Sequence, residues 1–476
     1  MFASRVFSAG PTPPKLTRAQ VLQSIIDATQ PLKFPRGDRL PILAWPAQDV
    51  PLDDAAAAEA FLGKLGDRGI GAFASWNYGD KDKSLAAGLK IARLQKKLGL
   101  PVAISAVGVM SGFYNGDKST AHVDADGKPF FDKSQTFVQL GCPFAVEGRY
   151  PAVQKQIDFF AKGYKDAGVD VDFVFADWEF DGPLEWGEAW ELSKKCVHCR
   201  EHIKDLDTSF PAFQKAVRTV RADMQKKVYA DLLRGYFPKI LVGNYGVYPN
   251  DGFRYWYDFF EKVPPPPAIE LKADHHAKFR PWFQEFPLTG YTYAMPVVFP
   301  RYRTFEYYDD SNTDYRWFHG LMQNASNVGK STPGDVPIVS WVRWGVTDAP
   351  KTPDANFKPM SEKTYQELLW HMLLRGHDGM FIFCNDAEAP KELRLLQEVY
   401  AASLQYKAFL DKGTPVTFAI PESAGPVVSG LKLGDRLLVR RTDFTDDDKP
   451  VMLTVGDQRV SIKRADGISQ VIQLEH

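Results

Sequence analysis

Residues 169–183, VDVDFVFADWEFDGP, place three carboxylates at the end of an apolar run. An aromatic-rich run with few charges is typical of a strand buried on both faces. Since side chains alternate along a strand, Asp177 and Glu179 share one face, and their backbones lie roughly 6.6 Å apart. Two carboxylates at the carboxyl end of a parallel strand indicate acid–base chemistry in a barrel enzyme. The alternative is a solvated loop or a structural ion pair.

The concentration of carboxylates on one strand limits the possible mechanisms of glycoside hydrolysis. A retaining glycosidase with a protein nucleophile needs a second carboxylate about 5–5.5 Å away, usually on another strand. Only Asp348 and Asp386 stand at or just beyond other strand ends. Substrate-assisted hydrolysis needs no protein nucleophile, because the 2-acetamido group of the substrate attacks the anomeric carbon. In that route Glu179 is the general acid/base, and Asp177 orients and stabilises the charged intermediate.

The segment Phe175-Ala-Asp177-Trp-Glu179-Phe-Asp-Gly resembles the fourth-strand signature of family 18 chitinases and, more loosely, the D-x-E motif of hyaluronidases. The resemblance implies that Glu179 is the acid and that Asp177 steers the acetamide. Phe175 stands where the chitinase pattern has its first aspartate, which shifts the likeness towards hyaluronidases. NYGVYP, at residues 244–249, is similar to a tyrosine-rich hyaluronidase strand and implies a role for Tyr245.

Further substrate-binding candidates lie at other strand ends. Tyr291-Thr-Tyr293-Ala-Met295-Pro resembles the sixth strand of the same enzymes, where a tyrosine binds the acetamide oxygen. The sequence favours the alternative that both tyrosines are side chains of the barrel core. Trp341 and Trp344 face opposite sides of their strand, so at most one points inward. The remaining candidates are Asp181, which has the same parity as the pair, and Asp386.

Composition excludes some partners and leaves others open. The chain has 476 residues, a net charge of −1 and 13% aromatic residues. The balanced charge argues against nucleic acid and anionic membranes as partners, and no run approaches the ~20 apolar residues of a membrane span. Aromatic rings suit a carbohydrate substrate. The N-terminus shows no secretory leader, but the ending Leu474-Glu475-His476 resembles a tag, so we expect a trimmed extracellular or periplasmic protein, with a cytoplasmic location left open.

The cysteines leave three states open. Cys196 and Cys199 form a CxxC motif with His198 and His202 alongside, and a zinc site would need four ligands. Only Cys142 offers a plausible distant thiol. The sequence therefore favours a local disulfide or free thiols over a metal, and we expect no cofactor.

Eight apolar runs alternate with amphipathic stretches, which predicts a closed (β/α)8 barrel. A doubly wound sheet is the alternative, although no GxGxxG follows the first strand. The predicted strands are Leu40–Pro46, Gly69–Asn77, Leu100–Gly108, Val171–Asp181, Lys239–Tyr248, Leu288–Phe299, Val336–Gly345 and Asp378–Asp386. The predicted domains are an extension (1–36), the barrel (37–411) and a small antiparallel, sandwich-like β domain (412–476).

Long connections follow the third, fourth and fifth strands, at Val109–Arg149, Gly182–Ser209 and Pro249–Pro287. Loops of this length build substrate clefts. An open groove lined by their aromatic side chains favours internal cleavage of a chain, whereas loops folded over one end would make a pocket and favour release of terminal units. Three successive long loops can form one side of a groove without closing its end, so we expect internal cleavage. The aromatic side chains are Phe113, Tyr114, Trp186, Trp190, Tyr255, Trp256 and Tyr257.

The sequence thus predicts a glycoside hydrolase that degrades a polysaccharide or glycan containing N-acetylhexosamine. The alternatives are a retaining glycosidase with a separate protein nucleophile and a carbohydrate-binding barrel without catalysis. The second is disfavoured by Glu179, because paired buried carboxylates are costly to keep without a function.

Overall fold

The computed structural model describes residues 16–51, 54–109, 117–133, 139–177, 187–245, 261–262, 272–273, 286–302, 310–347 and 357–475. These residues belong to two compact units. Unit 1 joins both ends of the chain, Met1–Ala72 and Val297–His476, and unit 2 is the continuous segment Phe73–Pro296. Among the described residues, no helix combines the length and the apolar character that crossing a bilayer requires.

Eight parallel strands form the main sheet, in the order β10-β11-β12-β1-β2-β3-β6-β7. Each overlaps one predicted strand, so a mixed α/β fold with eight parallel strands is confirmed. Most are shorter than predicted, because the apolar runs continue into the adjoining loops. Their bounds are β1 (Ile42–Gln48), β2 (Ile70–Asn77), β3 (Ala103–Gly108), β6 (Phe173–Ala176), β7 (Leu241–Asn244), β10 (Val297–Val298), β11 (Val339–Val342) and β12 (Gly379–Ile382).

The segment 291–298 runs beside a strand in each unit. In unit 2, Thr292 N–H donates to Val242 O of β7 at 2.9 Å, and its Oγ1 accepts from Val242 N–H at 2.8 Å. In unit 1, Val297 and Val298 pair in parallel with β11. The predicted sixth strand is therefore bonded to β7 at its start and to β11 at its end.

Helices connect the strands where amphipathic stretches predict them. The final predicted helix, Glu392–Leu410, is divided into α13, a 3-10 turn and α14. The bounds are α1 (Arg18–Ala28), α2 (Ala55–Gly66), α3 (Lys81–Lys97), α4 (Tyr150–Asp166), α7 (Phe210–Gln225), α8 (Asp231–Tyr236), α11 (Thr313–Ser331), α12 (Glu362–Leu373), α13 (Ala389–Ser403) and α14 (Lys407–Lys412). The predicted N-terminal extension contains α1, which begins with a capping box between Thr17 and Gln20.

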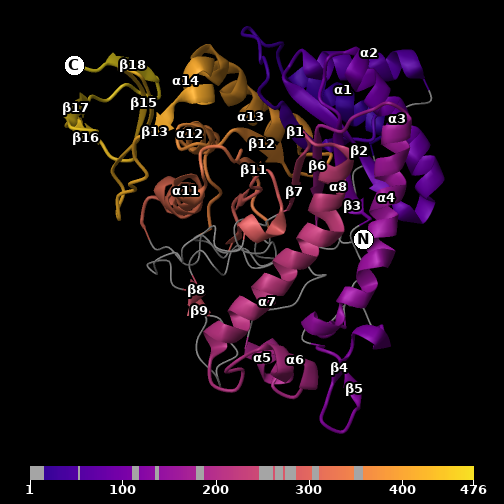
Figure 1. Cartoon of the computed structure of the whole chain (residues 1–476). Helices are drawn as coiled ribbons and strands as arrows, with labels where there is room; N and C mark the ends of the chain where they lie inside the picture. Colours follow the sequence, from indigo (N-terminus) through magenta and orange to yellow (C-terminus); the bar gives the residue numbers. More distant parts are fainter. Residues whose placement is uncertain are drawn as a thin grey trace. The chain divides into compact units, whose positions relative to one another are not determined.

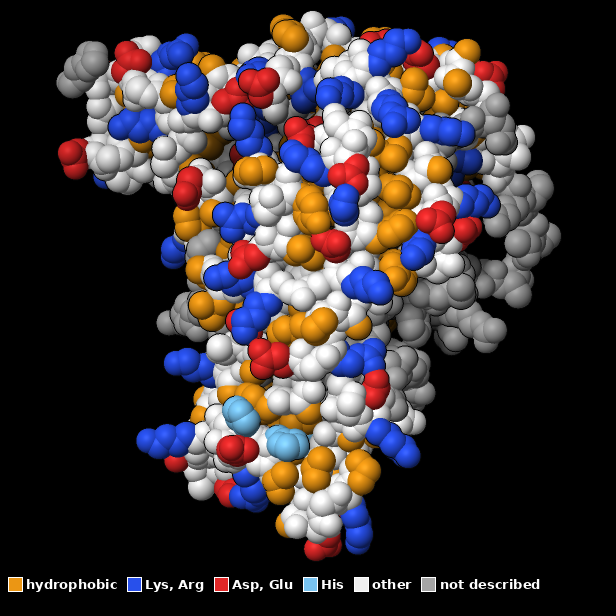
Figure 2. Space-filling view, turned by 45° about the vertical axis from the view of Figure 1, so that its right-hand side comes forward, with side chains coloured by type: hydrophobic (Ala, Val, Ile, Leu, Met, Phe, Trp, Pro, Cys, Tyr) orange, Lys and Arg blue, Asp and Glu red, His pale blue; other side chains and the backbone are white. Residues whose placement is uncertain are grey.

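The long loops after β3 and β6 carry short elements of their own. The first contains the hairpin β4 (His122–Val123) and β5 (Pro129–Phe130) and the 3-10 turn η3 (Pro143–Ala145). The second contains α5 (Gly187–Ser193) and α6 (Val197–His202). The hairpin, α5 and α6 lie together beside one end of α7 (Figure 1). The face shown in Figure 2 intersperses basic and acidic side chains, as the near-zero net charge predicts.

The C-terminal residues of unit 1 form antiparallel sheets, as predicted. One sheet has the order β13-β14-β15-β18, and β16 and β17 form the other. Buried side chains from both sheets make one small core, consistent with a sandwich: Val428, Leu437, Val439, Leu453, Val455, Ile462 and Leu474. The bounds are β13 (Thr414–Pro415), β14 (Pro426–Leu433), β15 (Arg436–Asp443), β16 (Val451–Val455), β17 (Gln458–Ile462) and β18 (Gln470–Gln473).

A buried polar stripe on α12 and the residues just after it attaches these sheets to the rest of unit 1. Glu367, His371 and Arg375 recur every four residues and therefore lie on one helical face. Glu367 forms two 2.7 Å hydrogen bonds with Arg440 of β15. His371 Nδ1 lies 2.7 Å from Ser429 Oγ of β14. Burial lowers the pKa of His371 well below its usual value, so the ring is neutral in the folded protein.

Arg375 makes most of these contacts, so replacing it tests how much the stripe contributes to stability. Its guanidinium is fully buried and donates to Ser429 Oγ at 2.7 Å, Phe418 O at 3.0 Å and Ala419 O at 2.9 Å. Arg375→Met removes the guanidinium donor from these acceptors, so we expect the free energy of unfolding in urea to fall by about 3–5 kcal/mol. Arg394→Met removes only two half-exposed ion pairs, with Glu362 and Glu398, and should cost about 1 kcal/mol or less. Equal losses would contradict the role of the stripe.

Candidate active site

The strand β6 positions the first candidate catalytic residue. Its four residues are buried and pair with β3 on one side and β7 on the other. The ring of Phe175 lies 5.4 Å from Phe73 of β2, and the ring of Phe173 lies 4.7 Å from Tyr293. These two side chains therefore face the same core. By strand parity, Asp177 follows them on that face.

Asp177 and Tyr245 come next to each other at the carboxyl ends of β6 and β7. The last register pair of these strands is Ala176 with Asn244, and Tyr245 N–H donates to Ala176 O at 2.8 Å. Because the strands are parallel, Asp177 and Tyr245 are the following residues at the same edge of the sheet. The fold thus brings together Asp177 and Tyr245, which were predicted as site residues from separate motifs.

The carboxyl group of Asp177 lies in an environment that disfavours its charge. Its Oδ1 atom is buried and accepts no hydrogen bond within the part of the chain that the structure describes. Burial raises the pKa of Asp177 from the usual 3.8 to about 6. A carboxyl group that takes up a proton near pH 6 can orient a polar substrate group or share a proton with a neighbour.

Three other carboxylates and most of the loop aromatics lie outside the described residues. These carboxylates are Glu179, Asp181 and Asp348. Of the aromatic side chains proposed to line a groove, the described one is Trp190. It is 4% exposed, and its indole N–H donates to Leu206 O at 2.6 Å. Trp190 therefore packs inside its own loop, and its assignment to a groove wall is wrong.

The two candidate tyrosines of the sixth strand are both buried. Tyr293 OH donates to Val174 O at 3.1 Å, and a Cβ on Gly243 would lie 2.7 Å from the Tyr293 ring. The glycine thus makes room for a core tyrosine whose hydroxyl is already used. Tyr291 packs against Tyr229 and Phe286, and its hydroxyl has no hydrogen-bond partner among the described residues. Tyr293 is therefore placed as a core side chain. At Tyr291 the buried hydroxyl group lacks a hydrogen-bond partner among the described residues.

The structure places the two candidate tryptophans in different surroundings, with Trp341 inside β11 and Trp344 beyond its end. Trp341 is buried and stacks on Phe381 at 4.2 Å, with Trp45 at 6.1 Å. Trp344 donates its indole N–H to Met360 O at 2.8 Å, and Lys391 Nζ lies 4.0 Å from its ring centroid. Trp341 is therefore part of an aromatic group shared by β1, β11 and β12, and Trp344 packs against α13.

Asp386, the candidate at the end of β12, is engaged by α1. Arg18 Nη1 lies 3.1 Å from Asp386 Oδ1 and also donates to Pro46 O at 2.7 Å. The side chain of Asp386 is 41% exposed. The carboxylate of Asp386 is thus held in an ion pair. This position favours a structural role over that of a free nucleophile.

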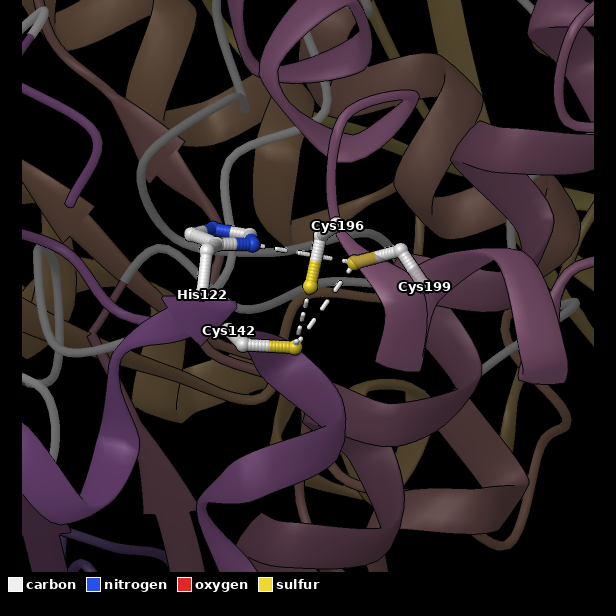
Figure 3. A group of neighbouring side chains, drawn as sticks. All are labelled: His122, Cys142, Cys196 and Cys199. Carbon is white, nitrogen blue, oxygen red and sulfur yellow. Dashed lines mark hydrogen bonds between the residues drawn. The ribbon is translucent and has the colours of Figure 1, made fainter. Parts of the chain in front are cut away.

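Sequence reasoning did not assign two further groups of side chains. A polar pocket of about 320 Å³ lies in unit 1 between α11, α12 and β15, and none of the candidate residues lines it. In unit 2, the loops after β3 and β6 bring together four side chains that could hold a metal ion, His122, Cys142, Cys196 and Cys199 (Figure 3). Only the CxxC part of this cluster, with Cys142, is visible as a signal in the sequence.

No protein-family model matches the chain, and no curated protein matches it significantly. Similar solved structures include the galactosidase domain of the alpha-galactosidase-sucrose kinase AgaSK, with 11% identity over 95% of this chain and 57% of that chain and a TM-score of 0.45. The GH36 alpha-galactosidase AgaA from Geobacillus stearothermophilus is 12% identical over 95% of this chain and 58% of its own, with a TM-score of 0.43. The PgaB (BpsB) glycoside hydrolase domain from Bordetella bronchiseptica is 13% identical over 76% and 98%, with a TM-score of 0.43.

The chain thus spans a little over half of the length of the first two proteins. Family membership is not established by these likenesses. The resemblance to family 18 chitinases and hyaluronidases stays a prediction from short motifs.

Proposed function

We propose that this chain is a glycoside hydrolase in which Asp177 and Glu179 carry out the acid–base chemistry. The observation that supports it is the carboxyl group of Asp177, whose Oδ1 atom is buried at the carboxyl end of a parallel strand and whose pKa is raised. Keeping such a group costs stability, so its place at a strand end favours a functional role. Tyr245, at the end of the next strand, is a neighbouring polar group for a sugar.

We further propose that the eight strands close into a (β/α)8 barrel. Thr292 is bonded to β7, and Val297, five residues later, is paired with β11. The segment from Thr292 to Val297 therefore joins a residue bonded to β7 and a residue paired with β11, the two ends of the strand order. A closed sheet directs the carboxyl ends of all its strands to one face, which is where barrel enzymes bind substrate.

The proposed mechanism is substrate-assisted cleavage next to an N-acetylhexosamine. Glu179 protonates the leaving oxygen, while Asp177 holds the N–H of the acetamide group and then stabilises the oxazolinium ion. Asp386 is less suited to act as a nucleophile, because Arg18 already holds it in an ion pair. A protein nucleophile at Asp348 is the alternative mechanism.

A panel of polysaccharides and glycans, assayed for released sugars and for binding in parallel, tests the proposed function. We expect hydrolysis of a substrate that contains N-acetylhexosamine, and oligosaccharides among the earliest products if the cleavage is internal. Binding without any product would contradict the enzyme and favour the carbohydrate-binding alternative. Monosaccharide as the sole early product would contradict internal cleavage alone.

A further inference from the structure

Four side chains with metal-binding atoms converge inside unit 2. His122 lies in β4, Cys142 immediately precedes η3, Cys196 immediately precedes α6, and Cys199 lies within α6. All four are 3% exposed or less. Their side chains point toward one common space (Figure 3), and the ligand atoms all lie within 4.8 Å of one another.

Three of the distances between these atoms match the edges of a tetrahedral zinc site. The Sγ atoms of Cys142 and Cys199 are 3.6 Å apart, and those of Cys196 and Cys142 are 3.8 Å apart. Cys199 Sγ lies 3.8 Å from His122 Nδ1. Four ligands placed about 2.3 Å from a central ion at tetrahedral angles are about 3.8 Å from each other. A disulfide would need a separation of about 2.05 Å, and all three cysteines are free thiols in the structure.

The surrounding backbone holds the ligands in place. The N–H groups of Cys199 and Phe144 are hydrogen-bonded to the sulfur atoms of Cys196 and Cys142. Cys142 N–H donates to Thr120 O at 2.7 Å, and a Cβ on Gly141 would lie only 2.1 Å from the same oxygen. Glycine at 141 therefore permits the close approach that brings Cys142 beside the β4 segment.

The imidazole is also fixed by its surroundings. The His122 ring stacks on Phe130, its partner across the β4–β5 hairpin, with centroids 5.1 Å apart and an interplanar angle of 16°. His202, next to the CxxC motif, is not part of the cluster. His202 stacks on Phe144 at 4.6 Å, and its Nδ1 lies 2.8 Å from His198 O. The histidine of the cluster is thus His122, which is distant in sequence.

We propose that His122, Cys142, Cys196 and Cys199 bind one zinc ion in a closed structural site. Three thiolates and one imidazole are a ligand set that zinc prefers, and four protein ligands leave no open position for a substrate or water. The ion ties the β4–β5 hairpin and the η3 turn, which follow β3, to α6, which follows β6. It thereby connects two long loops that would otherwise depend on few elements of regular structure.

Metal analysis of the full chain, purified after expression with zinc in the medium, tests this site. We expect about one zinc ion per chain by mass spectrometry of the metal content. Cys142→Ser and Cys199→Ser should reduce the zinc content to background. Cys384→Ala is the matched control, because Cys384 is a buried thiol of unit 1 and should leave the zinc content unchanged. Loss of zinc from the control to the same extent would overturn the assignment.

A second measurement avoids variants, since a ligand variant that fails to fold also loses its metal. Zinc is removed from the unaltered full chain with a chelator under reducing conditions, and Co²⁺ is then added. We expect strong d–d absorption of tetrahedral cobalt together with thiolate-to-cobalt charge-transfer bands, and both should disappear when zinc is added. A weak octahedral spectrum, or a disulfide among Cys142, Cys196 and Cys199 in the purified protein, would overturn the proposal. Both readouts are independent of any glycosidase activity.

Discussion

The variant Glu179→Gln should lose glycan hydrolysis by about 10³-fold or more in kcat, because glutamine keeps the shape of the side chain but carries no transferable proton. The loss should depend on the leaving group. A natural glycan leaves as a basic alkoxide and needs the proton, whereas an aryl glycoside such as a 4-nitrophenyl sugar leaves readily without it. We therefore expect the variant to retain far more activity on the aryl substrate.

The control for this experiment is Glu201→Gln, which changes an exposed glutamate of α6. It should leave the turnover of both substrates unchanged. An equal loss on the natural and the aryl substrate would show that Glu179 does not act as the general acid. Near-full turnover of Glu179→Gln on the natural glycan would remove Glu179 from the mechanism altogether.

Replacing Asp177 with asparagine should have opposite effects on stability and activity. The folded-state pKa of about 6 lies above the usual 3.8, so the folded protein binds this proton more tightly than the unfolded chain. The stability that protonation contributes is fully present below pH 3.8 and is lost as the pH rises through 6. At pH 7.5 the buried charge therefore destabilises the wild-type fold, and Asp177→Asn should raise the free energy of unfolding by on the order of 1–3 kcal/mol.

This gain should shrink towards zero near pH 4, where both side chains are neutral. Asp170→Asn, an exposed change just before the same strand, should alter stability by about 1 kcal/mol or less at either pH. Under the proposed mechanism, Asp177→Asn also lowers kcat strongly and weakens inhibition by a thiazoline mimic of the cyclised acetamide. A covalent sugar trapped on a carboxylate of the wild-type protein would instead indicate a protein nucleophile.

The strands could be predicted from the sequence because their signal is local. The run around Phe173 and Phe175 is apolar on both faces, and such a run has few alternatives to a buried strand. The sequence also limits Trp341 and Trp344 to opposite faces of their strand, and the structure decides which of them enters the aromatic group. The sequence could not predict the role of a side chain when that role depends on a partner distant in the chain.

The metal cluster illustrates that limit. Cys196 and Cys199 are conspicuous as a pair in the sequence. His122, however, lies in a two-residue strand, and a strand this short leaves no recognisable sequence pattern. The nearby His198 and His202 are the more obvious choices by spacing, yet neither belongs to the cluster, and the His202 ring stacks on Phe144. Only the fold of two loops brings the fourth ligand within reach, so sequence spacing could not identify it.

The pairing of β1 with β12 has a consequence for biosynthesis. Leu43 is the register partner of Phe381, so the first strand of the main sheet is completed by one of the last. During translation the N-terminal strand emerges long before its partner, while the continuous unit 2, Phe73–Pro296, has its whole sequence available earlier. The middle of the chain can therefore fold on the ribosome first, and an apolar β1 edge stays exposed until the end of synthesis. Chaperone dependence and aggregation of stalled or truncated chains should follow from this order of assembly.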